Sequence, residues 1–478
     1  MKLLRSILFW PFRNWWRAIP TVLLLALCVW GVFFVKRRDR LRAQKAEILA
    51  GIRARGDVAE FRDYAKLVRT DDPGLKHLCR AILSVGGETA GGYSRRMTRS
   101  PYREIETLIG DWKKPDDPPV PADWTYFESL KEPAADPKLA ALVKKLGPAL
   151  AELEEGCKHP AKVFPHDFHA ESPYSILLPH IQDMRALARA CRAANMQAIV
   201  NGDPRKAFHY VLLGINLAHR MEPEVFLISK LVEIAIFKVA CESLAFTLAY
   251  FDPTPEEFAA LDAALLAAER FSYRECMVSE QAVAVQTLDH LKMEEVLPLS
   301  GMRGGDAKEW RLRILAYYES SWLGEPDRLE DQIWLFSNLD QRTRAIDDLG
   351  PAGEEALKTY DAELAERKNA SLLGFLMPSI SNLRTAKHRH LVTAHLARGC
   401  LRAHRYLRQH GKLPDKIADF ADSSWPPSSE DYFGPSGPRY EKTADGFTLR
   451  HPDQSLGRGA PVNPYSLEVK YPPAKRPK

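Results

Sequence analysis

The sequence of 478 residues predicts a mainly α-helical protein with an N-terminal transmembrane helix, a helical-hairpin bundle and a small C-terminal β-hairpin. Three observations lead to this prediction. Residues 18–35 are apolar and uncharged, apolar residues recur at steps of three and four over much of 138–298 and 309–412, and an Asp-Gly pair separates two β-prone runs near the C-terminus. At this length we expect two or three packed units.

Composition excludes several classes of protein. The chain is 45% apolar and 27% charged and has 7 cysteines, which excludes a disordered chain, a collagen-like chain and a disulfide scaffold. Its net charge of +5 is unevenly distributed. Residues 1–45 hold ten Lys or Arg and one Asp, so the remaining chain holds 57 basic against 61 acidic residues. The basicity belongs to the N-terminal end, and we expect no nucleic-acid partner.

The segment 18–35 reads AIPTVLLLALCVWGVFFV. As a helix it would be about 27 Å long, enough to cross the hydrocarbon core of a bilayer. A cleaved signal peptide would have a shorter apolar core and a small-residue cleavage site, whereas this segment runs directly into basic residues. We therefore expect an uncleaved single-pass anchor in the cell membrane, in contact with the lipid bilayer. The residues assigned to its membrane interfaces are Trp15, Trp16, Arg17, Trp30, Lys36, Arg37 and Arg38.

The side of the membrane that holds the body of the chain stays open at this point. Four Lys or Arg precede the anchor within twenty residues and eight follow it, which favours a cytoplasmic body by the positive-inside rule. An odd number of cysteines without a Cys-x-x-Cys pair also favours reduced thiols. Both flanks are basic, however, so neither indication decides the orientation.

The rest of the chain divides at Pro-rich and Gly-rich stretches. Six prolines between Lys113 and Pro137 argue against a helix or central strand there, and the glycines of 299–308 indicate a second linker. The expected segments are 1–17, a basic and aromatic tail; 18–35, the transmembrane helix; 41–112, a helical segment; 113–137, a Pro-rich linker; 138–298, a helical-hairpin domain; 299–308, a linker; 309–412, a second helical segment; 413–451, a turn and β-hairpin; and 452–478, a flexible tail.

The clearest local pattern is a helical hairpin. An apolar stripe follows Pro179, and Gly202, Asp203 and Pro204 then supply a left-handed exit, an N-cap and a first helical turn for the next helix. A third, mostly apolar helix should end at Tyr250. The hairpin also resembles tetratricopeptide units, but we find no 34-residue repeat, so a plain bundle and a solenoid remain alternatives. Further helices are expected at 256–290, 309–320, 326–347, 353–368 and 381–410, and strands at 439–443 and 447–450.

Two blocks of the sequence resemble known proteins. Residues 177–244, with Leu178-Pro179-His180, Gly202-Asp203 and an Ile-Ser-x-Leu-Val-x-Ile-Ala-Ile run, resemble a family of uncharacterised bacterial single-pass membrane-anchored α-helical proteins. The C-terminal block from His410-Gly411 resembles the end of type II secretion pseudopilins. The resemblance implies an anchored helical protein of the cell envelope, on the exported side, and assigns no catalytic residue. Tyr432 stands where that block usually has Pro, and the pseudopilin processing site is missing, which argues against a pilus subunit.

Candidate chemistry is sparse. No nucleotide-binding, zinc-protease or hydrolase motif occurs, so no catalytic residue and no cofactor is assigned. Four histidines, with Asp167 or Glu171 beside them, are weak metal-ligand candidates, but their spacing matches no zinc signature and we expect them to serve as caps or surface residues. These histidines are His159, His166, His169 and His180. A basic helix at 384–408 could meet phosphate or anionic lipid, although a solvated face is the usual outcome for such a run.

The function expected from these features is that of a membrane-anchored helical interaction or scaffold protein of the bacterial cell envelope, with a protein partner there. One alternative is an enzyme of unrecognised type with a cleft between helical units. Another is a secretion-system-associated, pseudopilin-like component.

Overall fold

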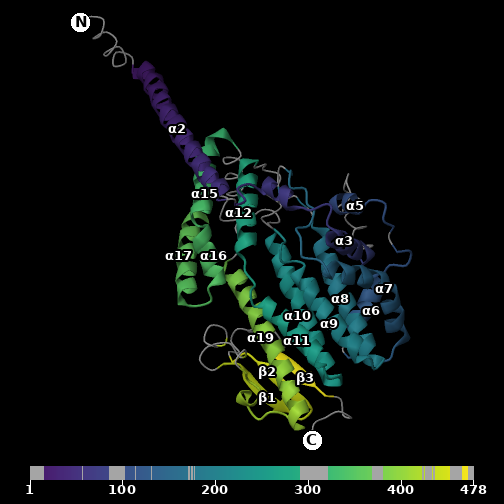
Figure 1. The fold of residues 1–478 in the computed structure, drawn as a ribbon. Helices are drawn as coiled ribbons and strands as arrows, with labels where there is room; N and C mark the ends of the chain where they lie inside the picture. Colours follow the sequence, from purple (N-terminus) through teal and green to yellow (C-terminus); the bar gives the residue numbers. More distant parts are fainter. Residues whose placement is uncertain are drawn as a thin grey trace, which may run out of the picture. The chain divides into compact units, whose positions relative to one another are not determined.

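The computed structural model confirms a mainly α-helical chain with an apolar N-terminal helix and a small C-terminal antiparallel sheet (Figure 1). The residues that it describes are 15–55, 57–85, 103–113, 115–130, 132–170, 173, 176, 178–290, 321–368, 380–422, 425, 433, 437–452 and 466–471. They form two compact units. Unit 1 comprises Met1–Glu60, Gln281–Leu339 and Ala362–Pro378, and unit 2 comprises Phe61–Glu280, Asp340–Asp361 and Ser379–Lys478. The linker expected at 299–308 and the helix expected at 309–320 lie outside the described residues.

Unit 1 is built around helix α2 (Trp15–Ala54). The expected anchor and the start of the expected segment 41–112 are thus one continuous helix, because no Pro or Gly cluster interrupts the basic stretch after the apolar one. Helix α15 (Glu325–Ser337) follows the short 3-10 helix η3 (Trp322–Gly324) and packs against α2. The ring of Trp322 meets Phe34 of α2 edge-on at 5.2 Å between centroids.

The centre of unit 2 is formed by helices α8 (Pro179–Val200), α9 (Pro204–His219) and α10 (Leu227–Tyr250), which pack against one another (Figure 1). The predicted turn is confirmed, since Gly202 has φ +68° and the Asp203 carboxylate accepts from the N–H of Lys206. Asn195 of α8 links all three helices. Its amide donates to the carbonyl of Ala207 at 2.9 Å and to the hydroxyl of Thr247 at 2.8 Å.

The N-terminal part of unit 2 packs beside this centre. It consists of η1 (Phe61–Leu67), α3 (Pro73–Val85), α5 (Arg103–Ile109), α6 (Pro121–Ser129) and α7 (Pro137–Cys157), with α3 in contact with α7 and α8. Our expectation of no helix within 113–137 was wrong. Pro121 occupies the first turn of α6, where the missing N–H has no intrahelical partner to lose and the fixed φ suits the helix.

The run expected as one helix at 256–290 is two helices, α11 (Pro255–Ala268) and α12 (Arg274–Asp289). Asp347 stabilises the turn between α11 and α12. Its carboxylate accepts from the hydroxyl of Ser272 at 2.7 Å and from the N–H of Tyr273 at 3.1 Å. The expected helix at 326–347 likewise divides at Asn338 into α15 and α16 (Leu339–Asp347). Helices α17 (Pro351–Lys368) and α19 (Ile380–His410) lie close to their predicted bounds.

The C-terminal sheet contains strands β1 (Arg439–Thr443), β2 (Gly446–Arg450) and β3 (Ser466–Lys470) in the order β1-β2-β3, all antiparallel (Figure 1). The predicted hairpin is confirmed, but part of the tail expected to be flexible at 452–478 forms β3. Gly446 does not adopt positive φ; it is needed because the carbonyl of Val469 in β3 lies 1.8 Å from the place a Cβ would occupy. The sheet packs its apolar face on α10 and α19.

Candidate functional site

Two of the four candidate histidines lie together with a glutamate that the sequence did not single out. His166 is in the connection between α7 and α8, His180 is in the first turn of α8, and Glu224 is in the connection between α9 and α10. Pro179 is the first residue of α8, a position that suits its fixed φ, and His180 follows it directly. The three side chains are at most 3% exposed. They are called the His-Glu cluster below.

The Glu224 carboxylate is the centre of the His-Glu cluster. Its Oε2 lies 3.3 Å from Nε2 of His166 and 3.4 Å from Nε2 of His180. Ser229 donates its hydroxyl to the same oxygen at 3.0 Å, and the backbone N–H of Phe164 donates to Oε1 at 3.2 Å. One nitrogen or oxygen of each of the three side chains lies within 4.8 Å of the others. Imidazole and carboxylate groups at this spacing could hold a divalent transition metal.

Aromatic rings surround the cluster, and burial and neighbouring charges shift the pKa values of two of its members. Phe164 stacks on His180 at 4.9 Å between ring centroids, and Phe226 meets His166 edge-on at 5.1 Å. Burial lowers the pKa of His180 below its ordinary value, although Glu224 acts in the opposite direction. Burial by itself would raise the pKa of Glu224, but the two imidazoles outweigh it and hold this pKa well below its ordinary value.

The other two candidate histidines do not join the cluster. The backbone carbonyl of His159 accepts from Arg220, and His169 is exposed, with its N–H bonded to the carboxylate of Asp167 at 3.3 Å. Glu171 lies outside the described residues. The histidines of the sequence therefore located two of the three residues of the cluster. They could not locate Glu224, because nothing in the short connection at 220–226 distinguishes a buried glutamate from an exposed one.

The basic helix α19 is partly buried rather than the solvated face that we expected. Arg398 and Arg402 are 1% and 2% exposed. Arg398 donates to Asp262 at 2.9 Å and to Glu269 at 2.6 Å, and Arg402 donates to both carboxylate oxygens of Asp262. These two guanidinium groups are neutralised within unit 2 and are not presented to phosphate or lipid. The sequence could not show this, since Asp262 is 140 residues from Arg402.

His404 of the same helix has a partner on each ring nitrogen. Nε2 lies 2.9 Å from the carboxylate of Asp252, and Nδ1 lies 2.9 Å from the hydroxyl of Tyr471. A neutral ring satisfies both contacts if Nε2–H donates to Asp252 and Nδ1 accepts from Tyr471. Burial lowers the pKa of His404, although Asp252 acts to raise it. This arrangement connects the residue after β3 to α19 and to the loop after α10, and its role is structural.

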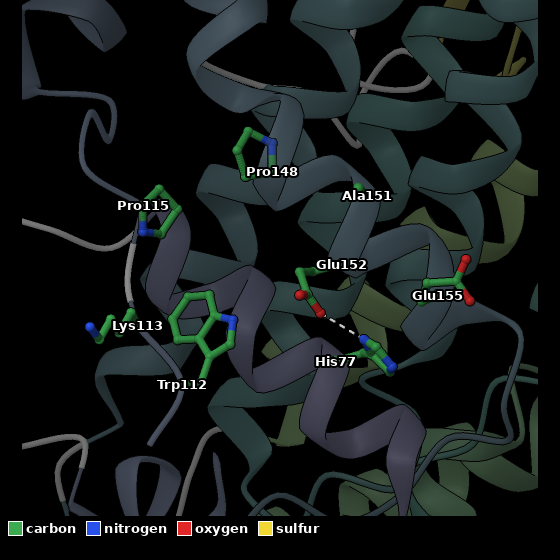
Figure 2. A pocket seen from close by; sticks show the side chains of 8 residues that line it. All are labelled: His77, Trp112, Lys113, Pro115, Pro148, Ala151, Glu152 and Glu155. Carbon is green, nitrogen blue, oxygen red and sulfur yellow. Dashed lines mark hydrogen bonds and ion pairs between the residues drawn. The ribbon is translucent and has the colours of Figure 1, made fainter. Parts of the chain in front are cut away.

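A pocket of about 380 Å³ opens beside α3 and α7 in unit 2. Figure 2 shows the His77 imidazole pointing toward the Glu152 carboxylate, with Nδ1 and Oε2 2.6 Å apart. Its lining consists of His77, Trp112, Lys113, Pro115, Pro148, Ala151, Glu152 and Glu155. This lining includes no Ser, Thr or Cys nucleophile, and the aromatic ring with two prolines and an alanine is typical of a binding surface.

The residues assigned to the membrane interfaces lie on α2. The side chains of Trp15, Trp16 and Arg17 are outside the described part of the chain. Trp30 is exposed and packs on Phe34 at 5.2 Å between centroids. Arg37 pairs with Asp327 and Glu330 of α15 at 2.8 and 2.9 Å, and Arg38 pairs with Asp39. The basic flank of the apolar stretch is therefore also an attachment to α15.

Comparison of the chain with protein-family models, with curated proteins and with solved structures finds no match.

Proposed function

We propose that this protein is a single-pass membrane-anchored helical scaffold of the bacterial cell envelope that holds a partner protein at the membrane. The observation that carries the proposal is the exposed apolar stretch of α2. The helix spanning Ile19–Ala54 is long and apolar enough to cross a membrane, and none of its apolar window is buried in the protein. The apolar side chains of this window, such as Leu23, Leu25 and Phe33, are exposed, as expected of side chains that contact lipid.

The ion pairs of unit 1 support the idea of a fixed attachment. Arg37 and Arg42 pair with acidic residues of α15, and Lys45 pairs with Asp289 of α12 at 2.9 Å. Each such pair near the surface contributes little alone, about 0–1 kcal/mol. Together they join the part of α2 that follows the apolar stretch to helices far along the chain.

A binding role is favoured over catalysis by how unit 2 uses its charged side chains. Arg398, Arg402 and His404 are engaged with carboxylates inside the fold. The pocket beside α3 and α7 offers apolar surface and a single imidazole-carboxylate pair. We further propose a cytoplasmic body, because eight Lys or Arg follow the apolar stretch and four precede it.

Membrane anchoring is tested by alkaline carbonate extraction of cell membranes. The wild-type chain is expected in the membrane pellet, and the double variant Leu24→Arg, Leu25→Arg in the supernatant, because each central arginine opposes insertion by about 2.5–3.5 kcal/mol. Leu67→Arg, which changes an exposed leucine of η1, is the control and should stay in the pellet. Release of the wild-type chain would contradict the proposal.

Partner binding is tested by photo-crosslinking in cells with a benzophenone amino acid at Lys113, which lines the pocket. We expect a crosslinked species of higher mass from position 113 and none from position 66, an exposed lysine that does not line the pocket. A chain that gives only the monomer from both positions, and that purifies alone as a monomer from mild detergent, is not a scaffold.

A further inference from the structure

The His-Glu cluster has the dimensions of a metal site. Its two imidazole nitrogens lie 3.3 and 3.4 Å from one oxygen of Glu224. A tetrahedral zinc ion with bonds of about 2.0–2.1 Å places neighbouring ligand atoms about 3.3 Å apart. An octahedral ion at about 2.1 Å would bring neighbouring ligands to about 3.0 Å. The two observed separations thus agree with two edges of a tetrahedron.

The same two contacts also satisfy hydrogen-bond geometry, but they are longer than other imidazole–carboxylate contacts of unit 2. His404 lies 2.9 Å from Asp252, and His77 lies 2.6 Å from Glu152. In the His-Glu cluster one carboxylate oxygen faces both imidazoles, which is the convergence that a shared metal ion requires.

Charge and burial also favour a cation. The side chain of Glu224 is 0% exposed and the two histidines are 3% exposed, among the rings of Phe164 and Phe226. A carboxylate taken out of water in such surroundings needs compensating charge. A divalent ion bound between the three side chains would supply that charge directly.

Two hydrogen-bond donors orient the Glu224 carboxylate. The N–H of Phe164 holds Oε1, and the hydroxyl of Ser229 contacts Oε2. Hydrogen bonds of this kind orient a metal-binding carboxylate and raise affinity. Phe164 belongs to the same connection as His166, and Ser229 lies in the first turn of α10, five residues after Glu224.

We propose that His166, His180 and Glu224 bind one Zn²⁺ in a tetrahedral site whose fourth ligand is water. Two histidines and a glutamate are a ligand set known for zinc. Because the three side chains are at most 3% exposed, no substrate reaches the ion in this conformation. Three protein ligands and one water are the set that catalytic zinc sites use, but closure to substrate leaves this ion a structural role. It ties the connection before α8 to the start of α8 and to the connection before α10.

The test uses the full chain in detergent, purified through a tag without histidine and freed of metal by a chelator. Titration with Zn²⁺ should show one tight site per chain and should raise the midpoint of thermal unfolding. Co²⁺ at the same site should give the intense visible absorption of a tetrahedral ion. A wild-type chain that takes up less than one Zn²⁺ tightly, or that gives only a weak octahedral Co²⁺ spectrum, overturns the proposal.

Variants assign the ligands. His180→Gln and Glu224→Gln should each weaken Zn²⁺ binding by at least about 100-fold, and Ser229→Ala by about 10-fold. His169→Gln, an exposed histidine near the cluster in sequence, should bind as the wild type does. If the ligand variants do not fold, the Co²⁺ spectrum of the wild type still decides. Equal binding by the wild type, His180→Gln and Glu224→Gln rules the site out.

Discussion

Arg402 of α19 and Asp262 of α11 form a two-point ion pair, with Nη1 2.7 Å from Oδ1 and Nη2 3.2 Å from Oδ2. Arg402 is 2% exposed, and the same Asp262 carboxylate also accepts from Arg398. The planar guanidinium matches the carboxylate in a way that an ammonium group cannot. Two helices separated by more than a hundred residues are thereby connected through one acidic side chain.

Removal of this contact should destabilise unit 2. Arg402→Ala leaves Asp262 with one partner fewer. Breaking a buried ion pair lowers the free energy of unfolding by about 3–5 kcal/mol. The loss should be smaller here, because Arg398 still pairs with Asp262. We expect a loss of about 2–3 kcal/mol. Arg402→Lys should recover only part of it, because lysine cannot form the fork. Chemical denaturation followed by circular dichroism measures the change.

Arg405→Gln, on the same helix, is the control. Arg405 is exposed, pairs with Asp422 at 3.4 Å and lies over the ring of Phe258, so its loss should cost at most about 1 kcal/mol. An Arg402→Ala chain as stable as Arg405→Gln would show that the buried pair does not hold α19 to α11.

The contact of His404 with Asp252 and Tyr471 should make stability depend on pH. Burial lowers the pKa of His404 below its unfolded value of about 6.5, so its contribution is present above pH 6.5 and is lost as pH falls through the lower folded pKa. Asp252 also pairs with Arg408, which opposes protonation of the ring. We therefore expect His404→Gln to flatten the fall of the unfolding midpoint between pH 7.5 and pH 5.

Thermal unfolding at several pH values in one buffer series checks this. Tyr471→Phe removes the hydroxyl at Nδ1 and should destabilise the chain at neutral pH by about 1 kcal/mol. A His404→Gln chain with the same pH dependence as the wild type would assign the acid sensitivity to other groups.

A pair of glycine substitutions separates close packing from helix propensity. A Cβ at Gly399 of α19 would lie 2.4 Å from the Trp425 ring, which is fully buried and donates its indole N–H to the carbonyl of His395. Gly399→Ala should therefore destabilise by about 1–3 kcal/mol. A Cβ at Gly51 of α2 would have only the end of the Arg55 side chain near it, at 4.0 Å, so Gly51→Ala should stabilise by up to about 1 kcal/mol. Destabilisation of the same size by both substitutions would contradict the assignment of Gly399 to packing.

The side of the membrane can be determined at an exposed position. The native thiols are poor reporters, because Cys276 is fully buried and burial raises the pKa of Cys157 to about 11. Lys66→Cys places a thiol at a side chain that is 78% exposed. With a cytoplasmic body, a membrane-impermeant maleimide should label this variant only after spheroplasts are permeabilised. Labelling of intact spheroplasts would place the body on the exported side.

The sequence by itself determined the features that depend on neighbours along the chain. The apolar helix, the turn at Gly202 and Asp203, the helix at 380–410 and the hairpin before Arg450 all follow from local periodicity, capping and turn chemistry. The helix at Pro121 was missed although its signal is local. The cluster of prolines was interpreted as a break in the helix pattern, whereas one of these prolines occupies the first turn of a helix.

Only the tertiary structure decided which polar side chains are buried and with whom. Arg402 and Asp262 are 140 residues apart, and Glu224 lies 58 and 44 residues from His166 and His180. A basic run on a helix is identical in sequence whether water or a carboxylate faces it. The difference arises when packing removes water, since a charge that loses its hydration must then find a partner from another segment.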